Sequence, residues 1–166
     1  MTHWVADTGP VLHLAEAGAL ELLPLLGEIA LPSAVHEELC LHQVSANLPT
    51  ELRILPLIDR HLLEAEDWCK AGLVHRGEAQ AIALARQIRA DVFLTDDAAA
   101  RLLATSLGLQ ARGSLGVILW LAGQQKISHP EASRYLENLA QTSLWISSRV
   151  LTEARSALEK LKYLKP

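Results

Sequence analysis

The chain has 166 residues, a formal net charge of −4 and 50% hydrophobic residues, so it is long enough for one domain with a sizeable core. No apolar stretch approaches the roughly 18 residues of a membrane helix, and the N-terminus lacks the basic and apolar regions of a signal peptide. Cys40 and Cys69 fit no metal-ligand spacing, so we expect reduced thiols in a soluble, cytoplasmic protein. The acidic charge does not indicate a protein that coats nucleic acid, although bound metal ions would offset clustered carboxylates.

The first half of the chain is predicted to alternate short strands with helices. Pro32 suits the first position of a helix, and Thr-Gly-Pro after residue 7 is typical of a turn. In chain order we predict a buried strand (3–7), helices (11–19 and 20–26), a strand (28–31), a helix from Pro32 to about Leu41, a loop (42–50) and a short peripheral strand (52–57).

The second half continues this alternation and ends in helices. We predict helices (59–70 and 78–89) around a loop (71–76) closed by Gly77, then a buried strand (91–95), a helix (98–107) ended by Gly108, a short strand (109–112), further helices (115–124, 130–140 and 152–161) and an edge strand (144–147). Alternating strands and helices favour an α/β fold with a mainly parallel sheet covered on both faces. Ligands of such sheets bind at the carboxyl ends of the strands.

Acidic residues are predicted to gather at that edge. Asp7 ends the first strand, the Asp96-Asp97 pair follows the strand 91–95, and Glu78 lies in the first turn of a helix. Each acid also has a structural explanation, because Asp7 and one of the pair could cap helices and Glu78 suits a helix dipole. Two adjacent carboxylates are harder to explain as caps, since only one of them can cap.

Glu38 adds a fourth element to this group. It lies three residues after Val35, on the apolar face of its helix, where an acid is rarely buried unless it is paired or binds metal; a place at the rim of the core is the alternative. Mg²⁺ and Mn²⁺ prefer carboxylate and water oxygens, and cleavage of phosphodiesters with these ions needs acids from several elements. We therefore expect Asp7, Glu78, Asp96 and Asp97 as metal ligands.

Other polar residues carry weaker signals. Arg101 lies four residues after Asp97, so it could form a local ion pair, orient Asp97 or contact a substrate phosphate. Thr8 and Ser114 could hydrogen-bond a metal ligand or its water, and Arg76 and Arg112 could meet an RNA backbone. The histidines show no metal-binding spacing and are interpreted as surface or cap residues: His3, His13, His36, His42, His61, His75 and His129.

Several segments together resemble the PIN-domain family, which includes the VapC-type toxins. The matching segments are VADTGPVLHLAEAG (5–18), LPSAVHEEL (31–39), RGEAQAIALA (76–85), FLTDDAAAR (93–101) and GSLGVIL (113–119). The resemblance is nearest to a branch of uncharacterised prokaryotic PIN-like proteins. In that branch a Gly-Glu-Ala segment opens the helix that carries an Asp in typical VapC toxins.

The resemblance implies a three-layer α/β/α sandwich and a Mg²⁺- or Mn²⁺-dependent endoribonuclease. It places the four acids of the family on Asp7, Glu38, Glu78 and Asp97, with Asp96 as an extra ligand and Glu78 as a departure from the usual Asp. It also implies a single domain over 1–166 with its core in about 3–125. The C-terminal helices (126–166) would then serve a homodimer or a small antitoxin partner.

Two other functions fit parts of the pattern. One is a catalytically weak or inactive PIN-like module that binds RNA or metal and regulates. The other is a phosphoryl-accepting or phosphatase domain with a nucleophilic Asp. The second is disfavoured because Asp7-Thr8-Gly9 lacks a second acid two residues on and no Lys follows a strand where such a site needs one.

Overall fold

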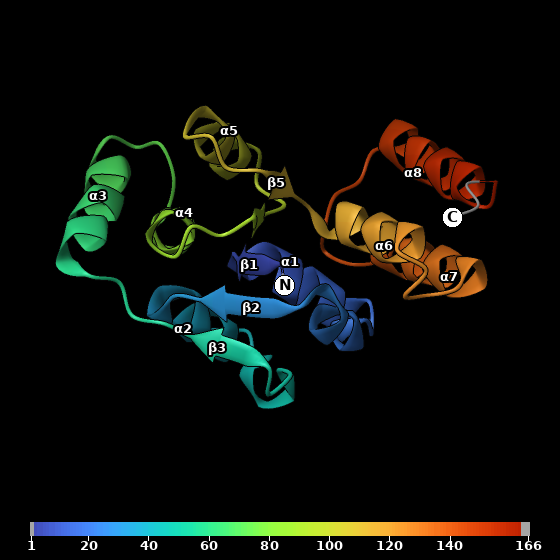
Figure 1. Ribbon diagram of the computed structural model, residues 1–166, viewed down its shortest axis with the longest axis horizontal. Coiled ribbons are helices and arrows are strands. Elements are labelled where there is room, and N and C mark those ends of the chain that lie inside the picture. The colour runs from blue at the N-terminus through green and yellow to red at the C-terminus, as the bar shows by residue number, and fades with distance from the viewer. Residues whose placement is uncertain (1, 164–166) are drawn as a thin grey trace.

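A five-stranded sheet with parallel pairing throughout forms the middle of the molecule (Figure 1). The computed structural model describes residues 2–163. The strand order is β3-β2-β1-β4-β5, which makes β1 the central strand. The strands are β1 (His3–Ala6), β2 (Glu28–Leu31), β3 (Leu52–Ile54), β4 (Val92–Leu94) and β5 (Ala111–Arg112). The predicted parallel sheet is confirmed, and the short strand predicted over residues 52–57 lies at its edge but covers only Leu52–Ile54.

Helices cover both faces of the sheet and give the predicted three-layer α/β/α fold. The α-helices are α1 (Thr8–Glu16), α2 (Ser33–Leu41), α3 (Asp59–Lys70), α4 (Arg76–Gln87), α5 (Ala98–Ser106), α6 (Ser114–Gly123), α7 (His129–Leu139) and α8 (Ser148–Leu161). Two 3₁₀ segments, η1 (Leu20–Leu26) and η2 (Ser45–Asn47), complete the connections. In Figure 1, α3 lies beside α4 at one end of the molecule, while α6, α7 and α8 pack together at the other.

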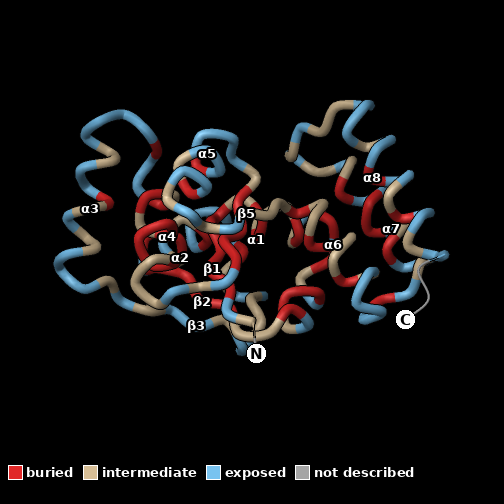
Figure 2. Tube along the Cα trace, turned by 45° about the horizontal axis from the view of Figure 1, so that its top comes forward, coloured by how far each residue is buried: buried red, intermediate tan, exposed pale blue. Residues whose placement is uncertain are grey.

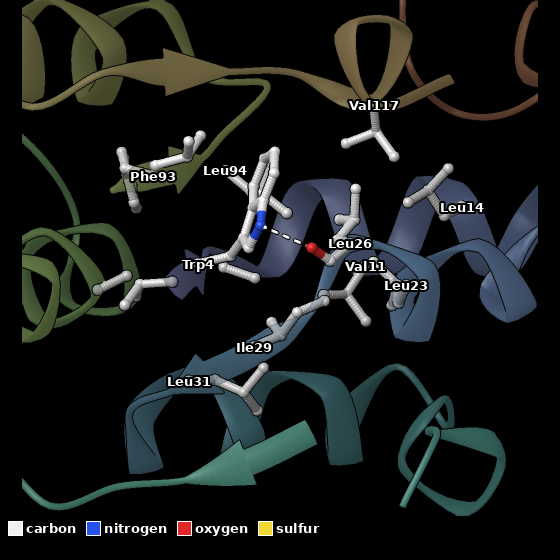
Figure 3. Close-up of a cluster of buried hydrophobic side chains, with 14 of the residues drawn as sticks. Trp4, Val11, Leu14, Leu23, Leu26, Ile29, Leu31, Phe93, Leu94 and Val117 are labelled. Atoms are coloured by element: carbon white, nitrogen blue, oxygen red, sulfur yellow. Dashed lines mark hydrogen bonds between the residues drawn. The ribbon is translucent and has the colours of Figure 1, made fainter. Parts of the chain in front are cut away.

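The central strand is buried because both of its neighbours and both helical layers cover it (Figure 2). Trp4 is 1% exposed and donates its indole N–H to the carbonyl of Leu26 at 3.1 Å (Figure 3), so its polar atom stays satisfied in the core. Its ring meets Trp120 edge to face, with centroids 5.3 Å apart. One hydrophobic cluster extends from Trp4 to Leu158 along the chain.

The strand register brings the ends of β1 and β4 together. Ala6 pairs with Leu94, and the backbone N–H of Asp7 donates to the carbonyl of Leu94 at 2.9 Å. Asp7 and Thr95 are therefore neighbours at the carboxyl edge of the sheet. Because Asp96 and Asp97 follow Thr95 directly, the acids that end two separate strands converge there.

Several helices begin earlier than the sequence predicts, including α8 at Ser148 rather than Thr152, and two of them affect the candidate site. Helix α1 begins at Thr8 rather than Val11, because Asp7 is its N-cap and Pro10 is tolerated in a first turn whose N–H groups have no helical partners. Helix α4 begins at Arg76, so Gly77 is a helical residue and not the end of a loop. A Cβ at Gly77 would collide with the carboxylate of Glu38, which explains why the close approach needs glycine.

The predicted edge strand over residues 144–147 is wrong. This segment pairs with no strand and leads into α8, whose N-cap Ser147 accepts a hydrogen bond from Val150 N at 3.2 Å.

No helix within residues 2–163 is both long and apolar enough to cross a membrane. The division of the chain into a core and C-terminal contact helices stays a prediction, and residue 1 and residues 164–166 of the predicted domain lie outside the described residues.

Candidate active site

A cavity of about 350 Å³ opens at the carboxyl edge where β1 and β4 end. The acids predicted from the sequence all lie in its wall, although they come from four separate places along the chain. The cavity is lined by Asp7, Thr8, Gly9, His13, Glu38, His75, Gly77, Glu78, Asp96, Asp97 and Leu144. The convergence expected from the strand ends is therefore present in the structure.

Asp7 lies at the bottom of the cavity and is only 4% exposed. Its carboxylate accepts hydrogen bonds from Thr8 N at 2.7 Å and from the Thr95 hydroxyl at 3.1 Å. Burial raises the pKa of Asp7 to about 7; these bonds oppose the shift, while the nearby charges of Glu78 and Glu38 add to it. Asp7 is thus both a helix cap and a poorly compensated buried carboxylate.

Glu38 reaches the cavity from α2, as its position on the apolar face of that helix predicts. Its carboxylate accepts a hydrogen bond from the Thr8 hydroxyl and lies against the backbone of Gly77. The predicted role of Thr8 as a hydrogen-bond partner of an acidic ligand therefore has a geometric basis. Glu37, on the other side of the same helix, forms an exposed ion pair with Arg76 at 2.7 Å.

Glu78 lies in the first turn of α4 and lines the same cavity. Its carboxylate accepts a hydrogen bond from His75 N at 2.7 Å and forms a capping box with that residue. Glu78 can therefore stabilise the start of α4 and still face the cavity, because one carboxylate has more acceptor sites than the cap uses. The remaining acceptor sites of Glu78 are available to the cavity.

Asp97 caps α5 and lies in the cavity wall. Its carboxylate accepts a hydrogen bond from Ala100 N at 2.7 Å, and its own N–H donates to the Thr95 hydroxyl at 3.1 Å. Thr95 is fully buried and bonds Asp7 as well, so its hydroxyl ties the two strand ends together. This link was not anticipated from the sequence, although Thr95 directly precedes the acidic pair.

Asp96 differs from the other acids because its oxygens are already occupied. It accepts hydrogen bonds from Ser114 N at 2.7 Å, from the Ser114 hydroxyl at 2.5 Å and from His13 Nδ1 at 2.7 Å. Burial would raise the pKa of Asp96, but the bonds from His13 and Ser114 outweigh it and hold this pKa below its usual value. This geometry favours Asp96 as the residue that orients His13 and the start of α6.

His13 is a site residue that sequence reasoning missed. It projects from α1 into the cavity wall, where the interpretation as a surface or cap residue does not hold. Within residues 2–163 its Nε2 has no hydrogen-bond partner, so this atom remains available to a ligand. A signal was present, because His13 is a polar residue in an apolar helix that begins directly after the first strand.

Arg101 does not pair with Asp97. Its guanidinium donates to the carbonyl of Thr95 at 3.1 Å and to that of Ala111 at 3.3 Å, which braces the turn after β4 against β5. The residue lines a neighbouring groove rather than the acidic cavity. The local ion pair expected from its spacing to Asp97 is therefore not formed.

Comparison with known proteins decides the family. A protein-family model described as a PIN domain matches residues 3–160. The chain belongs to the PIN-domain family. PIN domains are generally nucleases and typically use divalent metal ions. No curated protein and no solved structure matched the chain.

The donor set of this PIN domain suits a hard divalent cation. Within residues 2–163, no group of three or more His, Cys, Asp or Glu side chains is placed so that it could hold a metal ion as the side chains stand. The reason is visible in the contacts, since Glu38, Glu78 and Asp97 each turn toward a nearby hydroxyl or backbone N–H. Mg²⁺ keeps several of its waters and binds through one or two carboxylates, so an open carboxylate cavity with an uncompensated Asp7 fits it better than a closed cage would.

Proposed function

We propose that this protein is a Mg²⁺- or Mn²⁺-dependent endoribonuclease. The observation that carries the proposal is the convergence of Asp7, Glu38, Glu78 and Asp97 on one cavity, with Asp7 buried and its pKa raised to about 7. A buried carboxylate group of this kind is unfavourable unless a cation offsets it. RNA is the substrate that the family resemblance implies.

The chain supplies position and charge to the reaction. Asp7 and Asp97 would bind the cation, because the strand ends and their cap hydrogen bonds hold them in place. Glu78 would bind it directly or through water, and Glu38, fixed by Thr8, would orient the attacking water. The bound ion supplies stabilisation of the charge that develops on the scissile phosphate and lowers the pKa of water.

The proposed products follow from the direction of attack. The water oxygen forms a new bond to phosphorus, the bond between phosphorus and the 3′ oxygen breaks, and a proton goes to that leaving oxygen. The products are then a 5′-phosphate and a 3′-hydroxyl. Sequencing of the RNA ends after cleavage distinguishes these products from a 2′,3′-cyclic phosphate, which would contradict attack by water.

Asp97→Asn provides the sharpest test of the catalytic acids. Asparagine still accepts the hydrogen bond from Ala100 N, so the cap of α5 remains while the charge is lost. Loss of a partner of a metal ligand alone typically costs 10–100-fold in activity, so we expect loss of the ligand to lower RNA cleavage by at least about 100-fold. Cleavage of a mixed RNA panel with Mn²⁺ measures this, and thermal unfolding checks that the fold is retained.

The result that would contradict the proposal is equally specific. If the unchanged protein cleaves no RNA with either ion, or if Asp97→Asn cleaves as well as the unchanged protein, the acids are not the catalytic centre. Exposed Glu66→Gln on α3 serves as the control for loss of one carboxylate elsewhere.

The finer proposal is a cytoplasmic toxin of a toxin–antitoxin pair, acting as a homodimer with a small protein that blocks the cavity. It rests on the resemblance to VapC-type toxins. Growth arrest on expression, relieved by Asp97→Asn, would support it, whereas normal growth with active enzyme would argue against a toxin.

An inactive regulatory module is the second candidate, because the carboxylates are engaged in hydrogen bonds and no three of them within residues 2–163 are placed to hold a metal ion. Calorimetric titration with Mn²⁺ together with the RNA panel separates the two functions. Metal or RNA binding without cleavage favours the module.

A further inference from the structure

A second groove, of about 380 Å³, lies next to the acidic cavity. The two share Asp96 and Leu144 in their walls, so a strand bound in one would lie beside the other. One side of the groove is the junction of β5 and α6, and the other is the irregular segment between α7 and α8, which runs back beside the start of α6 (Figure 1). Its volume lies in the roughly 300–1,000 Å³ range of small-ligand sites.

The β5 side of the groove carries positive charge. Arg101 and Arg112 both line it, and Arg101 is placed by its bonds to the Thr95 and Ala111 carbonyls. The Nε of Arg112 is buried without a hydrogen-bond partner within residues 2–163. The only acid in the wall is Asp96, whose oxygens already accept bonds from Ser114 and His13. The groove therefore offers guanidinium donors beside one carboxylate whose oxygens are already engaged in other hydrogen bonds.

The opposite side presents an aromatic ring to solvent. Trp145 is 84% exposed, although it is among the largest apolar side chains of the protein. Its segment is nevertheless held in place, because Ser143 binds the carboxylate of Glu16 through its N–H at 2.8 Å and Ser147 caps α8. An ordered backbone that exposes a tryptophan beside two arginines is typical of a surface that stacks a planar ligand.

We propose that this groove binds one nucleotide of single-stranded RNA next to the scissile phosphate. The base stacks on Trp145, and the phosphate is held by Arg112 with Arg101 beside it. Guanidinium groups match phosphate geometry, and stacking on an aromatic ring accepts any base. This subsite rests on the proposed function, because the acidic cavity must be the place where the same strand is cut.

Charge and position favour RNA over a protein partner for this groove. Arg101 and Arg112 in its wall complement a polyanion, and the groove shares Asp96 and Leu144 with the cavity that would hold the cleaved bond. The wall also contains Leu115, Leu144 and Ile146, but these side chains are half-buried. Trp145 and Val150 present apolar surface to solvent, which is less than a protein or a second copy of the chain would need. A contact of Trp145 with a second copy of the chain would appear in the experiment below as a dimer that Trp145→Ala dissociates.

The test measures RNA binding rather than cleavage. Full-length protein carrying Asp97→Asn is titrated into a fluorescein-labelled single-stranded RNA 10-mer with Mg²⁺, and into the same backbone lacking all bases. Adding Trp145→Ala should weaken binding of the normal 10-mer by about 5- to 100-fold and leave binding of the abasic strand almost unchanged. Trp145→Phe should retain most of the binding, because it keeps a ring.

Arginine and control variants separate the two contacts. Arg112→Gln should weaken the binding of both oligonucleotides by a similar factor. It should also reduce the salt dependence of binding by about one phosphate contact. Tyr163→Ala removes another exposed aromatic ring, 81% exposed beyond the far end of α8, and should change neither affinity. Thermal unfolding of each variant confirms that the fold is intact.

Three results would overturn the subsite. These are unchanged binding by Trp145→Ala, equal losses on the normal and abasic strands, or a dimer that Trp145→Ala dissociates without any change in RNA affinity. Failure of the proposed function is distinguishable, because RNA binding that depends on Trp145 without cleavage by the unchanged protein would refute the ribonuclease and leave the subsite standing. RNA cleavage by the unchanged protein, together with RNA binding that Trp145→Ala leaves unchanged, would support the ribonuclease and refute the subsite.

Discussion

At the scale of single residues, Asp7 combines two roles that oppose each other. It caps α1 through Thr8 N, which favours the charged form, but its burial favours the neutral form and raises its pKa to about 7. A structural cap alone would gain by lying nearer to solvent. The buried position is therefore best explained by a cation that shares the cavity with Asp7 when the protein works.

Asp7→Asn is expected to stabilise the metal-free protein as pH rises. The folded pKa of about 7 exceeds the usual 3.8, so the contribution of a protonated Asp7 is fully present below 3.8 and is lost as pH rises through about 7. The free energy of unfolding of Asp7→Asn minus that of the unchanged protein should grow by about 2 kcal/mol between pH 5 and pH 8. Urea unfolding in EDTA measures it, and a difference that does not change with pH would contradict the shifted pKa.

At the scale of elements, the contact between α2 and α4 places two of the acids. Gly77 allows α4 to approach the carboxylate of Glu38, and Glu78 follows it directly. A glycine inside a helix usually costs about 0.5–1 kcal/mol relative to alanine. Its presence in α4 is explained by the space that Glu38 needs.

Gly77→Ala should therefore lower activity more than stability. The new Cβ would meet only the carboxylate end of the flexible Glu38 side chain and displace it from the cavity. We expect the free energy of unfolding to change by less than about 1 kcal/mol, because the carboxylate can rotate away and alanine favours a helix, while RNA cleavage falls.

Two comparisons make this prediction specific. Gly123→Ala in α6 places its Cβ 3.6 Å from Leu161, an ordinary contact, and should be neutral or slightly stabilising. The double variant Gly77→Ala with Glu38→Ala should cleave RNA no more slowly than Glu38→Ala alone, because the carboxylate that the Cβ displaces is already gone. Additive losses in the double variant would show that the collision is not the cause.

At the scale of the whole molecule, the net charge of −4 and the acidic cavity oppose the binding of a polyanion. A cation in the cavity and the arginines of the second groove would together offset this negative charge. The ion would offset the carboxylates at the scissile phosphate, and Arg101 and Arg112 would hold the strand beside it. The overall charge of a protein is therefore a poor guide to a substrate that is held by local positive groups.

Divalent metal should stabilise the whole fold in a pH-dependent way. Binding requires an ionised Asp7, so Mn²⁺ should raise the melting temperature more at pH 8 than at pH 6. At about 100 times the dissociation constant the stabilisation is about 2.7 kcal/mol.

Differential scanning fluorimetry at constant ionic strength measures the shift. Asp7→Asn should abolish most of the Mn²⁺ effect, whereas the exposed control Glu66→Gln should leave it unchanged. A shift equal in all three proteins would point to nonspecific ion binding, and no shift in the unchanged protein would contradict a metal site.

The sequence by itself determined the strands, most of the helices and the edge at which acids gather. Apolar runs that end in Asp7 and in Asp96-Asp97 specify buried parallel strands, and chain geometry then places both ends at one edge. The helical face of Glu38 follows from spacing alone. These inferences succeeded because each depends on local periodicity.

Only the tertiary structure decided how the side chains are used. The contact of His13 with Asp96 joins residues 83 positions apart, and the groove joins the start of α6 to Trp145 in a segment that forms no strand. The exclusion of a Cβ at Gly77 depends likewise on α2. Such contacts depend on how helices pack across the sheet, which no local pattern specifies, and they include the hydrogen bonds of Asp96 with His13 and Ser114. The predicted role of Asp96 as a metal ligand stays a prediction.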